Sequence, residues 1–113
     1  MQEYIKSLED EFLQILNGFK GEEKRALADF KAKDHTYIKK LAYLTYQSKI
    51  YQVRIYGVFL FDYLYEDVEI LNFMRDEVSK DENWRVQEVL AKSFDEFCKK
   101  QDIKTHFQLL MNG

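Results

Sequence analysis

Residues 51–64 read YQVRIYGVFLFDYL, and residues 81–99 read DENWRVQEVLAKSFDEFCK. When the two segments are aligned at an offset of 31 residues, Val53-Arg54-Ile55 falls on Trp84-Arg85-Val86, and the apolar positions that follow also pair. Apolar residues spaced by three and four are typical of helices that bury one face. Helical pairs that recur at about this length are typical of an α-solenoid. The two segments therefore predict a stack of antiparallel helix pairs.

The composition of the whole chain also favours helices. Its 113 residues include no Pro and only 4 Gly, so the turn formers that sandwiches and barrels need are scarce. Hydrophobic residues make up 46% and charged residues 33%, which is typical of a globular domain. We therefore predict an all-α superhelix of HEAT-like antiparallel helix pairs in one domain, residues 1–113. Residues 1–50 would form basic N-terminal helices, 51–101 two HEAT-like units and 102–113 an atypical tail.

Start and stop signals divide the chain into about six helices. Asn17-Gly18 would close the first helix, and Ser79-Lys80-Asp81-Glu82 has the spacing of a capping box at the start of the last. Leu27 and Phe30 are the apolar pair of the second helix, and Gly57 would let a neighbouring helix approach closely. The expected helices cover about 2–16, 21–33, a third capped by Asp34 or Thr36 and ending before Ser48, 51–65, 67–78, and one from the capping box to about residue 100.

Several function classes are disfavoured. A single cysteine, Cys98, excludes an internal disulfide framework and fits a reducing compartment. The N-terminus lacks the apolar region of a signal peptide, and no apolar stretch is long enough to span a membrane. His35 and His106 lack metal-ligand spacing, and no Gly-rich phosphate loop is present. We therefore expect a cytoplasmic protein with no metal and no cofactor.

Charge is divided unevenly along the chain. Residues 19–54 contain nine Lys or Arg and four Asp or Glu, whereas residues 62–96 contain four basic and eleven acidic residues. A basic segment attracts phosphates. The candidate phosphate contacts are Lys39, Lys40, Lys49 and Arg54, with Arg85 from the second segment; the ligand that these residues would bind depends on the resemblance described next. The alternative is that these side chains are simply a solvated helix exterior.

Residues 51–64 and 81–99 together resemble the DNA alkylation repair proteins, AlkD-like DNA glycosylases built of HEAT-like repeats. The resemblance extends from about Glu22 to Lys100, and Asn-Trp-Arg-Val-Gln-Glu, residues 83–88, is its most specific part. It implies a protein that binds duplex DNA with alkylated bases and, at full length, hydrolyses the bond between an alkylated purine and its deoxyribose. Such proteins continue through further repeats, whereas this sequence ends in QDIKTHFQLLMNG. We expect a shortened member, whose enzymatic activity the sequence leaves open.

The resemblance also implies a site. In one branch of the family the repeat helix starts with Asn-Trp and has a catalytic Asp four residues after the Trp; here Trp84 and Glu88 have that spacing. Residues four apart share one helix face, about 6 Å apart along the axis. An indole face can hold a cationic alkylated purine, and a carboxylate can stabilise oxocarbenium character as the bond breaks. The alternative is that Trp84 is a core anchor and the spacing is chance.

Two functions remain open at this point. The first is a DNA alkylation repair protein of the HEAT-like type. The second is a catalytically inactive helical-repeat module for protein–protein interaction or self-association, including a homodimer through the exposed end of the helical stack. Six tyrosines could stack on bases or instead bury their rings in helix seams. They are Tyr43, Tyr46, Tyr51, Tyr56, Tyr63 and Tyr65.

Overall fold

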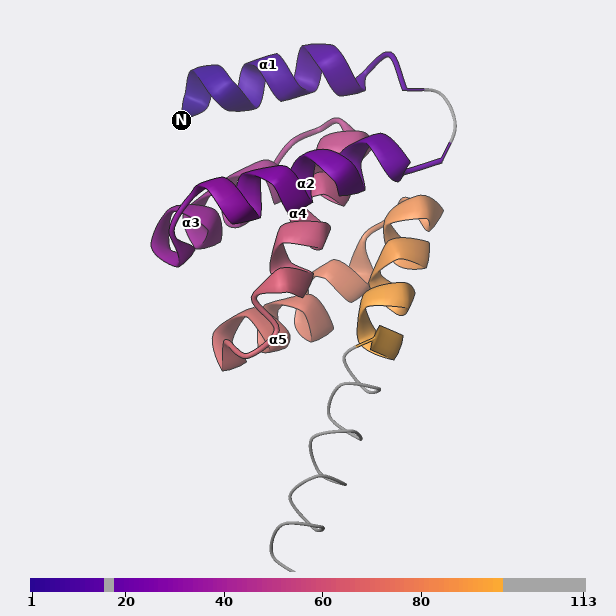
Figure 1. The fold of residues 1–113 in the computed structure, drawn as a ribbon. Coiled ribbons are helices and arrows are strands. Elements are labelled where there is room, and N and C mark those ends of the chain that lie inside the picture. The colour runs from indigo at the N-terminus through magenta and orange to yellow at the C-terminus, as the bar shows by residue number, and fades with distance from the viewer. Residues whose placement is uncertain (16–17, 97–113) are drawn as a thin grey trace, which may run out of the picture.

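The computed structural model of the chain describes residues 1–15 and 18–96, and its regular structure in these ranges is entirely helical (Figure 1). The elements are α1 (Gln2–Phe12), α2 (Lys20–Ala32), α3 (His35–Tyr46), α4 (Tyr51–Tyr63), α5 (Val68–Asp76), a 3₁₀ turn η1 (Val78–Lys80), and a last helix over residues 84–96. We call this last element the 84–96 helix. The prediction of an all-α stack of about six helices is confirmed. The predicted tail, Cys98 and His106 lie outside the described residues.

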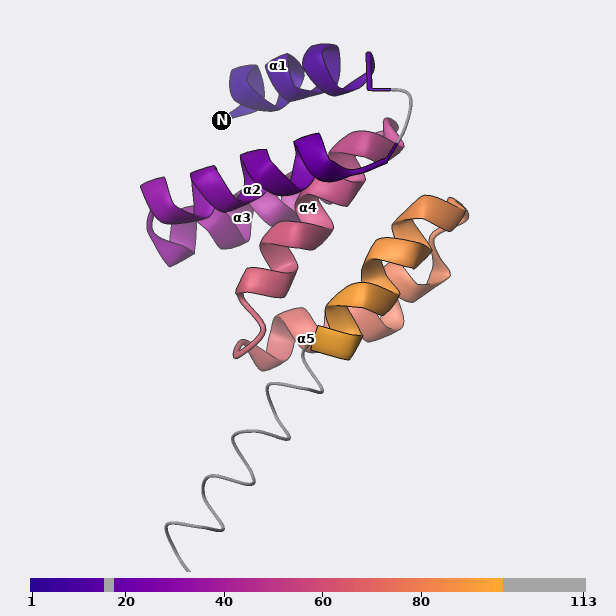
Figure 2. The same cartoon turned by 45° about the vertical axis from the view of Figure 1, so that its right-hand side comes forward.

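Helix α4 forms the centre of the packing. It contacts α1, α2, α3 and α5, and Figures 1 and 2 show it in the middle of the molecule. Its sequence is apolar around most of the helix, which is typical of an element covered on all sides. The buried residues of α4 are Gln52, Val53, Ile55, Tyr56, Gly57, Val58, Phe59, Leu60, Phe61 and Asp62. No helix in the described ranges has both the length and the apolar character needed to cross a membrane.

Gly57 lies where α3 and α4 come closest, as predicted. A Cβ atom at this position would lie 2.7 Å from Thr45 Oγ1 and 3.1 Å from the backbone oxygen of Ala42. The Thr45 hydroxyl cannot easily move, because it donates to the backbone oxygens of Leu41 and Ala42. The close approach of the two helices therefore depends on a residue without a side chain.

Some predicted boundaries and faces were wrong. Helix α1 ends at Phe12 rather than near residue 16, and the Gln52 amide donates to the backbone oxygen of Ile15 beyond the helix end. Leu27, expected inside, is 40% exposed, whereas Ala26 is fully buried. Ala26 and Leu27 are adjacent and point to different sides of α2, so they cannot both face the core. The side that carries the small Ala26 is the one that packs inward, which lets α2 lie close to α4.

The predicted capping box at residues 79–82 was also wrong. The Ser79 hydroxyl donates back to the Arg75 carbonyl, and the 84–96 helix is capped by Asn83 instead. Asn83 Oδ1 accepts from the backbone N–H groups of Arg85 at 2.9 Å and Val86 at 3.4 Å. The helix therefore begins at Trp84, with Val86, Val89 and Leu90 buried.

We predict that Gly57→Ala will destabilise the fold by about 1–3 kcal/mol, because the new methyl group overlaps the α3 backbone. Urea unfolding followed by circular dichroism measures this change. Gly21→Ala is the matched control, since its Cβ would meet only the flexible end of Ile15, at 3.1 Å. Equal stability of the two variants would contradict a tight α3–α4 contact.

Candidate nucleic-acid interface

Trp84 is the first residue of the 84–96 helix and is 65% exposed. The alternative interpretation, in which it anchors the core, is therefore wrong. The guanidinium carbon of Arg85 lies 4.6 Å from the centroid of the indole ring, so a cation already contacts this aromatic surface.

Glu88 lies one helical turn beyond Trp84. Its side chain is exposed, while the neighbouring Val86, Val89 and Leu90 point into the core. Because residues four apart lie on the same face of a helix, the indole and the carboxylate share the solvent side of the 84–96 helix. The predicted juxtaposition of these two side chains is therefore present on an accessible surface.

Arg54 connects this helix start to the rest of the protein. Its Nε donates to Asp81 Oδ2 at 2.9 Å and its Nη2 to Asp81 Oδ1 at 3.3 Å. Its Nη1 donates to the backbone oxygens of Ser48 at 3.0 Å and Lys49 at 3.1 Å. The guanidinium therefore joins α4, the loop that carries Lys49, and the segment just before Trp84. This geometry makes Arg54 a positioning residue; its contact with phosphate stays a prediction.

The carboxylate of Asp81 is held as an anion in this contact. Burial alone would raise its pKa, but hydrogen bonds from Arg54, the Asn83 backbone and Tyr46 outweigh burial and lower the pKa. The Tyr46 hydroxyl donates to Asp81 Oδ2 at 3.0 Å. The pKa of Tyr46 is raised by its burial and by this bond. A charged Asp81 is therefore part of the folded state at neutral pH.

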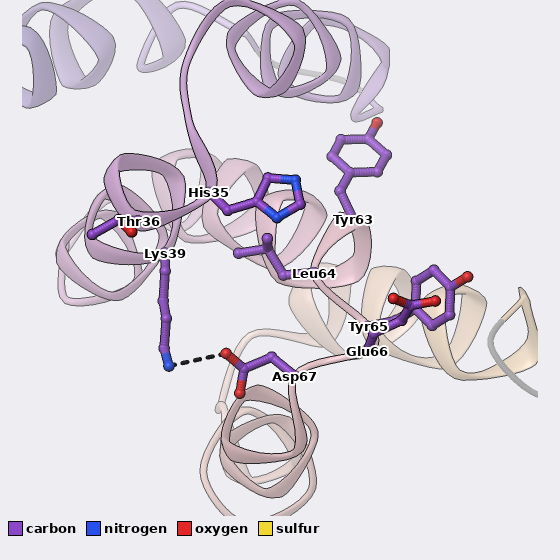
Figure 3. A pocket seen from close by; sticks show the side chains of 8 residues that line it. All are labelled: His35, Thr36, Lys39, Tyr63, Leu64, Tyr65, Glu66 and Asp67. Atoms are coloured by element: carbon purple, nitrogen blue, oxygen red, sulfur yellow. Dashed lines mark ion pairs between the residues drawn. The ribbon is translucent and has the colours of Figure 1, made fainter.

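Lys39 lies in the first half of α3, away from this network. Its ammonium group is 3.0 Å from Asp67 Oδ2 and 2.5 Å from Glu69 Oε2. Figure 3 shows it reaching Asp67 across a pocket of about 520 Å³ that is also lined by His35 and Tyr63. Lys39 thus bridges α3 and α5, and its charge is already balanced by two carboxylates.

Lys40 and Lys49 are exposed and have no ion pair among the described residues, so both ammonium groups are available to a ligand. The backbone oxygen of Lys49 accepts a hydrogen bond from Arg54, which pairs with Asp81. Asp81 lies three residues before Trp84, where the last helix begins. The structure therefore places Arg85 on the Trp84 ring and Arg54 on the segment just before Trp84, while Lys49 contacts Arg54 through its backbone oxygen. Lys40 lies at the middle of α3, six residues or about 9 Å along the axis from its last residue.

Glu22 was not identified from the sequence, where it looked like an ordinary acidic residue at a helix start. It is fully buried, and neither carboxylate oxygen has a hydrogen-bond partner in the described ranges. Burial raises its pKa to about 7, although its own backbone and the positive charge of Arg85 act in the opposite direction. Glu22 therefore provides a weakly acidic group behind the Trp84 edge.

The tyrosines serve mainly the core. The Tyr56 ring is buried and its hydroxyl donates to Asp29 Oδ2 at 2.5 Å, as does that of Tyr4. Tyr43 packs edge-on against Phe61 and Phe73. His35 stacks on Phe30 at the start of α3. Within residues 1–15 and 18–96, no group of three His, Cys, Asp or Glu side chains is arranged to hold a metal ion.

Two solved structures are similar to this chain. One is the crystal structure of AlkD2 from Streptococcus mutans, with 63% sequence identity and a TM-score of 0.88, and the match covers 96% of this chain and 52% of that one. The other is the crystal structure of smu.31 from Streptococcus mutans UA159, with 61% identity, a TM-score of 0.82, and coverage of 95% and 51%. No protein-family model and no curated protein matches the chain.

The described helices therefore form a helical-repeat protein with the fold of these two structures. The chain is an AlkD-like protein, as its resemblance indicated. It spans about half the length of the AlkD-type structures that it matches.

We predict that Asp81→Asn will destabilise the protein at neutral pH by about 3 kcal/mol, because Arg54 loses its buried counter-ion. In the parent, the stabilisation from the lowered Asp81 pKa is complete above the unfolded pKa of about 4 and is lost as pH falls through the lower folded pKa. In the Asp81→Asn variant, the contribution of residue 81 to the free energy of unfolding should no longer change with pH.

Urea unfolding between neutral and acid pH measures both effects. Asp76→Asn is the control, because Asp76 pairs with Arg75 on an exposed surface and its loss should leave the midpoint nearly unchanged. A parent and an Asp81→Asn variant with the same stability at neutral pH would contradict this role.

Proposed function

We propose that this protein binds duplex DNA and holds a cationic N-alkylated purine against Trp84, with Glu88 beside the base. The observation that carries the proposal is the exposure of Trp84 next to an exposed carboxylate one turn away. The AlkD-type relatives supply the alkylation-repair context. Cleavage of the glycosidic bond is the finer part of the same proposal.

The proposal is supported by the chemistry of the lesion. Alkylation of a purine ring nitrogen gives the base a positive charge, and such a base is attracted to an indole face by about 0.5–2 kcal/mol. The negative charge of Glu88 would attract the cationic alkylated base but not a neutral, unmodified base. Arg85 occupies one face of Trp84, so the lesion would use the other face or displace the guanidinium.

Phosphate contacts would come from two lysines without ion pairs among the described residues. Lys40 lies on α3, and Lys49 lies in the loop between α3 and α4. Each phosphate contact releases about one counter-ion, so affinity falls steeply as salt rises. Arg54 and Lys39 contribute indirectly, since their charges already hold the loops and helices together. A hydrophobic module that binds another protein or itself would show little salt dependence.

We predict that Lys40→Gln with Lys49→Gln will weaken binding to a 20-base-pair duplex and reduce the slope of log affinity against log salt by about 2. Fluorescence anisotropy with a labelled duplex measures both. Lys6→Gln with Lys31→Gln has the same change in net charge on α1 and α2 and serves as the control. Equal slopes for the two double variants would show that the basic residues are only solvated surface.

Trp84 and Glu88 are tested with a duplex that contains one N7-methylguanine, against the unmodified duplex. We predict that Trp84→Phe will reduce the preference for the methylated duplex while leaving the thermal midpoint nearly unchanged, because the side chain is largely exposed. Trp84→Leu, which has no aromatic face, should remove the preference. A preference that survives both changes would contradict a role for the indole.

Base release is measured at stoichiometric protein and low salt. If Glu88 supports cleavage, Glu88→Gln should slow release by about 100-fold or more without a change in stability. Glu3→Gln is the control for net charge, since Glu3 lies on α1. A parent chain that releases no methylated base would remove the glycosylase part of the proposal and leave lesion binding.

A further inference from the structure

Glu22 is a buried acid without a partner, and the proposed function does not use it. Its side chain is fully buried in the first turn of α2, and neither carboxylate oxygen accepts a hydrogen bond within residues 1–15 and 18–96. An ionised carboxylate is strongly disfavoured in such surroundings, because nothing replaces the water that it loses. The described arrangement is therefore that of the neutral carboxyl group.

The last helix packs against this part of α2. The Lys92 ammonium lies 3.5 Å from Glu23 Oε2 and 5.3 Å from the centroid of the Phe19 ring. Figures 1 and 2 show the N-terminal end of the 84–96 helix close to the start of α2. Arg85, in the first turn of that helix, is near enough for its positive charge to lower the pKa of Glu22, although it donates no hydrogen bond to the carboxyl group.

Arg85 has two competing partners at this junction. Its guanidinium carbon lies 4.6 Å from the centroid of the Trp84 ring, where it gains a cation–π attraction. An ionised Glu22 would offer a stronger partner, because a guanidinium can donate two hydrogen bonds to a carboxylate. In the described arrangement the guanidinium covers the ring and does not bond to the carboxyl group. A bond to an ionised Glu22 therefore requires the Arg85 side chain to move toward α2.

Glu22 can change its charge near neutral pH. Burial raises its pKa from the usual 4.5 to about 7, against the opposing effects of its own backbone and of Arg85. Among the described residues, the side-chain charge that acts on the pKa of Glu22 is that of Arg85. The other titratable side chains of the elements packed here are Glu23 and Asp29 on α2, Tyr56, Asp62 and Tyr63 on α4, and Glu88 and Lys92 on the 84–96 helix.

Two of these neighbouring acids are satisfied by other groups. Glu23 pairs with Lys92, and Asp29, two turns along α2 from Glu22, accepts hydrogen bonds from the hydroxyls of Tyr4 and Tyr56. They therefore do not compete with Glu22 for the Arg85 guanidinium.

We propose that Glu22 is a positioning residue whose charge sets where the Arg85 side chain lies. With Glu22 neutral, the guanidinium covers one face of Trp84. With Glu22 ionised, the proton passes to water, the guanidinium turns toward α2, and that face is left open. The consequence for DNA rests on the proposed function: as pH rises through neutral, a cationic N-alkylated purine gains access to both faces of the indole.

The first test uses the 113-residue chain without DNA, because Trp84 is its single tryptophan. Tryptophan emission, followed from about pH 5 to about pH 9, should show a transition centred near 7. Glu22→Gln and, separately, Arg85→Gln should each abolish this transition. Glu23→Gln is the matched control one residue away, and the transition should remain in it.

His35→Gln with His106→Gln removes both histidines, the residue type that ordinarily titrates in this range, and should also leave the transition in place. A transition that survives Glu22→Gln or Arg85→Gln would overturn the inference. A parent whose emission does not change with pH would overturn it as well.

Urea unfolding tests the titration of Glu22 separately. An acid whose pKa is raised in the folded state stabilises that state below its unfolded pKa of about 4.5, and this contribution is lost as pH rises through about 7. The parent should therefore lose stability relative to Glu22→Gln between about pH 5 and pH 8. A difference between the two proteins that does not change with pH would contradict a buried, titrating Glu22.

The link to the lesion is measured with the duplex that contains one N7-methylguanine, at about pH 6 and pH 8. The preference of the parent for this duplex over the unmodified one should rise several-fold at the higher pH, and that of Glu22→Gln should stay constant. The same rise in both proteins would overturn the control by Glu22. A parent without preference at either pH would contradict the proposed function instead, while the emission titration still decides the positioning of Arg85.

Discussion

The ion pair of Arg54 with Asp81 is the contact on which the candidate surface depends. The Asp81 side chain is 5% exposed and that of Arg54 19%, so both charges are largely removed from water. Such a pair is tolerated only when the remaining hydrogen-bonding capacity is satisfied. Here the Tyr46 hydroxyl and the Asn83 backbone N–H donate further hydrogen bonds to Asp81. Arg54 in turn donates to the backbone oxygens of Ser48 and Lys49. The Gln87 amide adds bonds to the carbonyls of Val78, Ser79 and Asp81. The start of the 84–96 helix is therefore fixed relative to α3 and α4.

The same kind of contact explains why two of the basic side chains are not free to bind a ligand. Arg54 pairs with Asp81, and Lys39, in the first half of α3, pairs with Asp67 and Glu69. Two of the five basic residues that the sequence suggested for DNA are therefore used to join helices.

Helical periodicity was enough to predict which residues of most helices point inward, and the missing side chain of Gly57 predicted the close approach of α3. The Trp84–Glu88 pair was singled out by the resemblance to AlkD-like proteins, and helical periodicity added only that the two residues share a face. What could not be predicted depends on contacts between distant segments. Arg54 and Asp81 are separated by 27 positions, so the sequence showed a basic residue without its partner. Glu22 looked solvated for the same reason, since its burial depends on what packs over α2.

The charges around Trp84 bear on how the proposed site would choose its base. Glu88 and Glu82 lie within one turn of the indole, and such acids repel the phosphates of DNA over a screening length of about 8 Å. In the proposed complex they would therefore weaken contact with undamaged duplex, whose bases are neutral. A cationic alkylated base reverses the sign of this local interaction and also gains the attraction of the indole face. The acids would then lower the affinity for DNA in general while they raise the ratio of lesion to normal binding, and Lys40 and Lys49 would have to supply the general affinity from farther away.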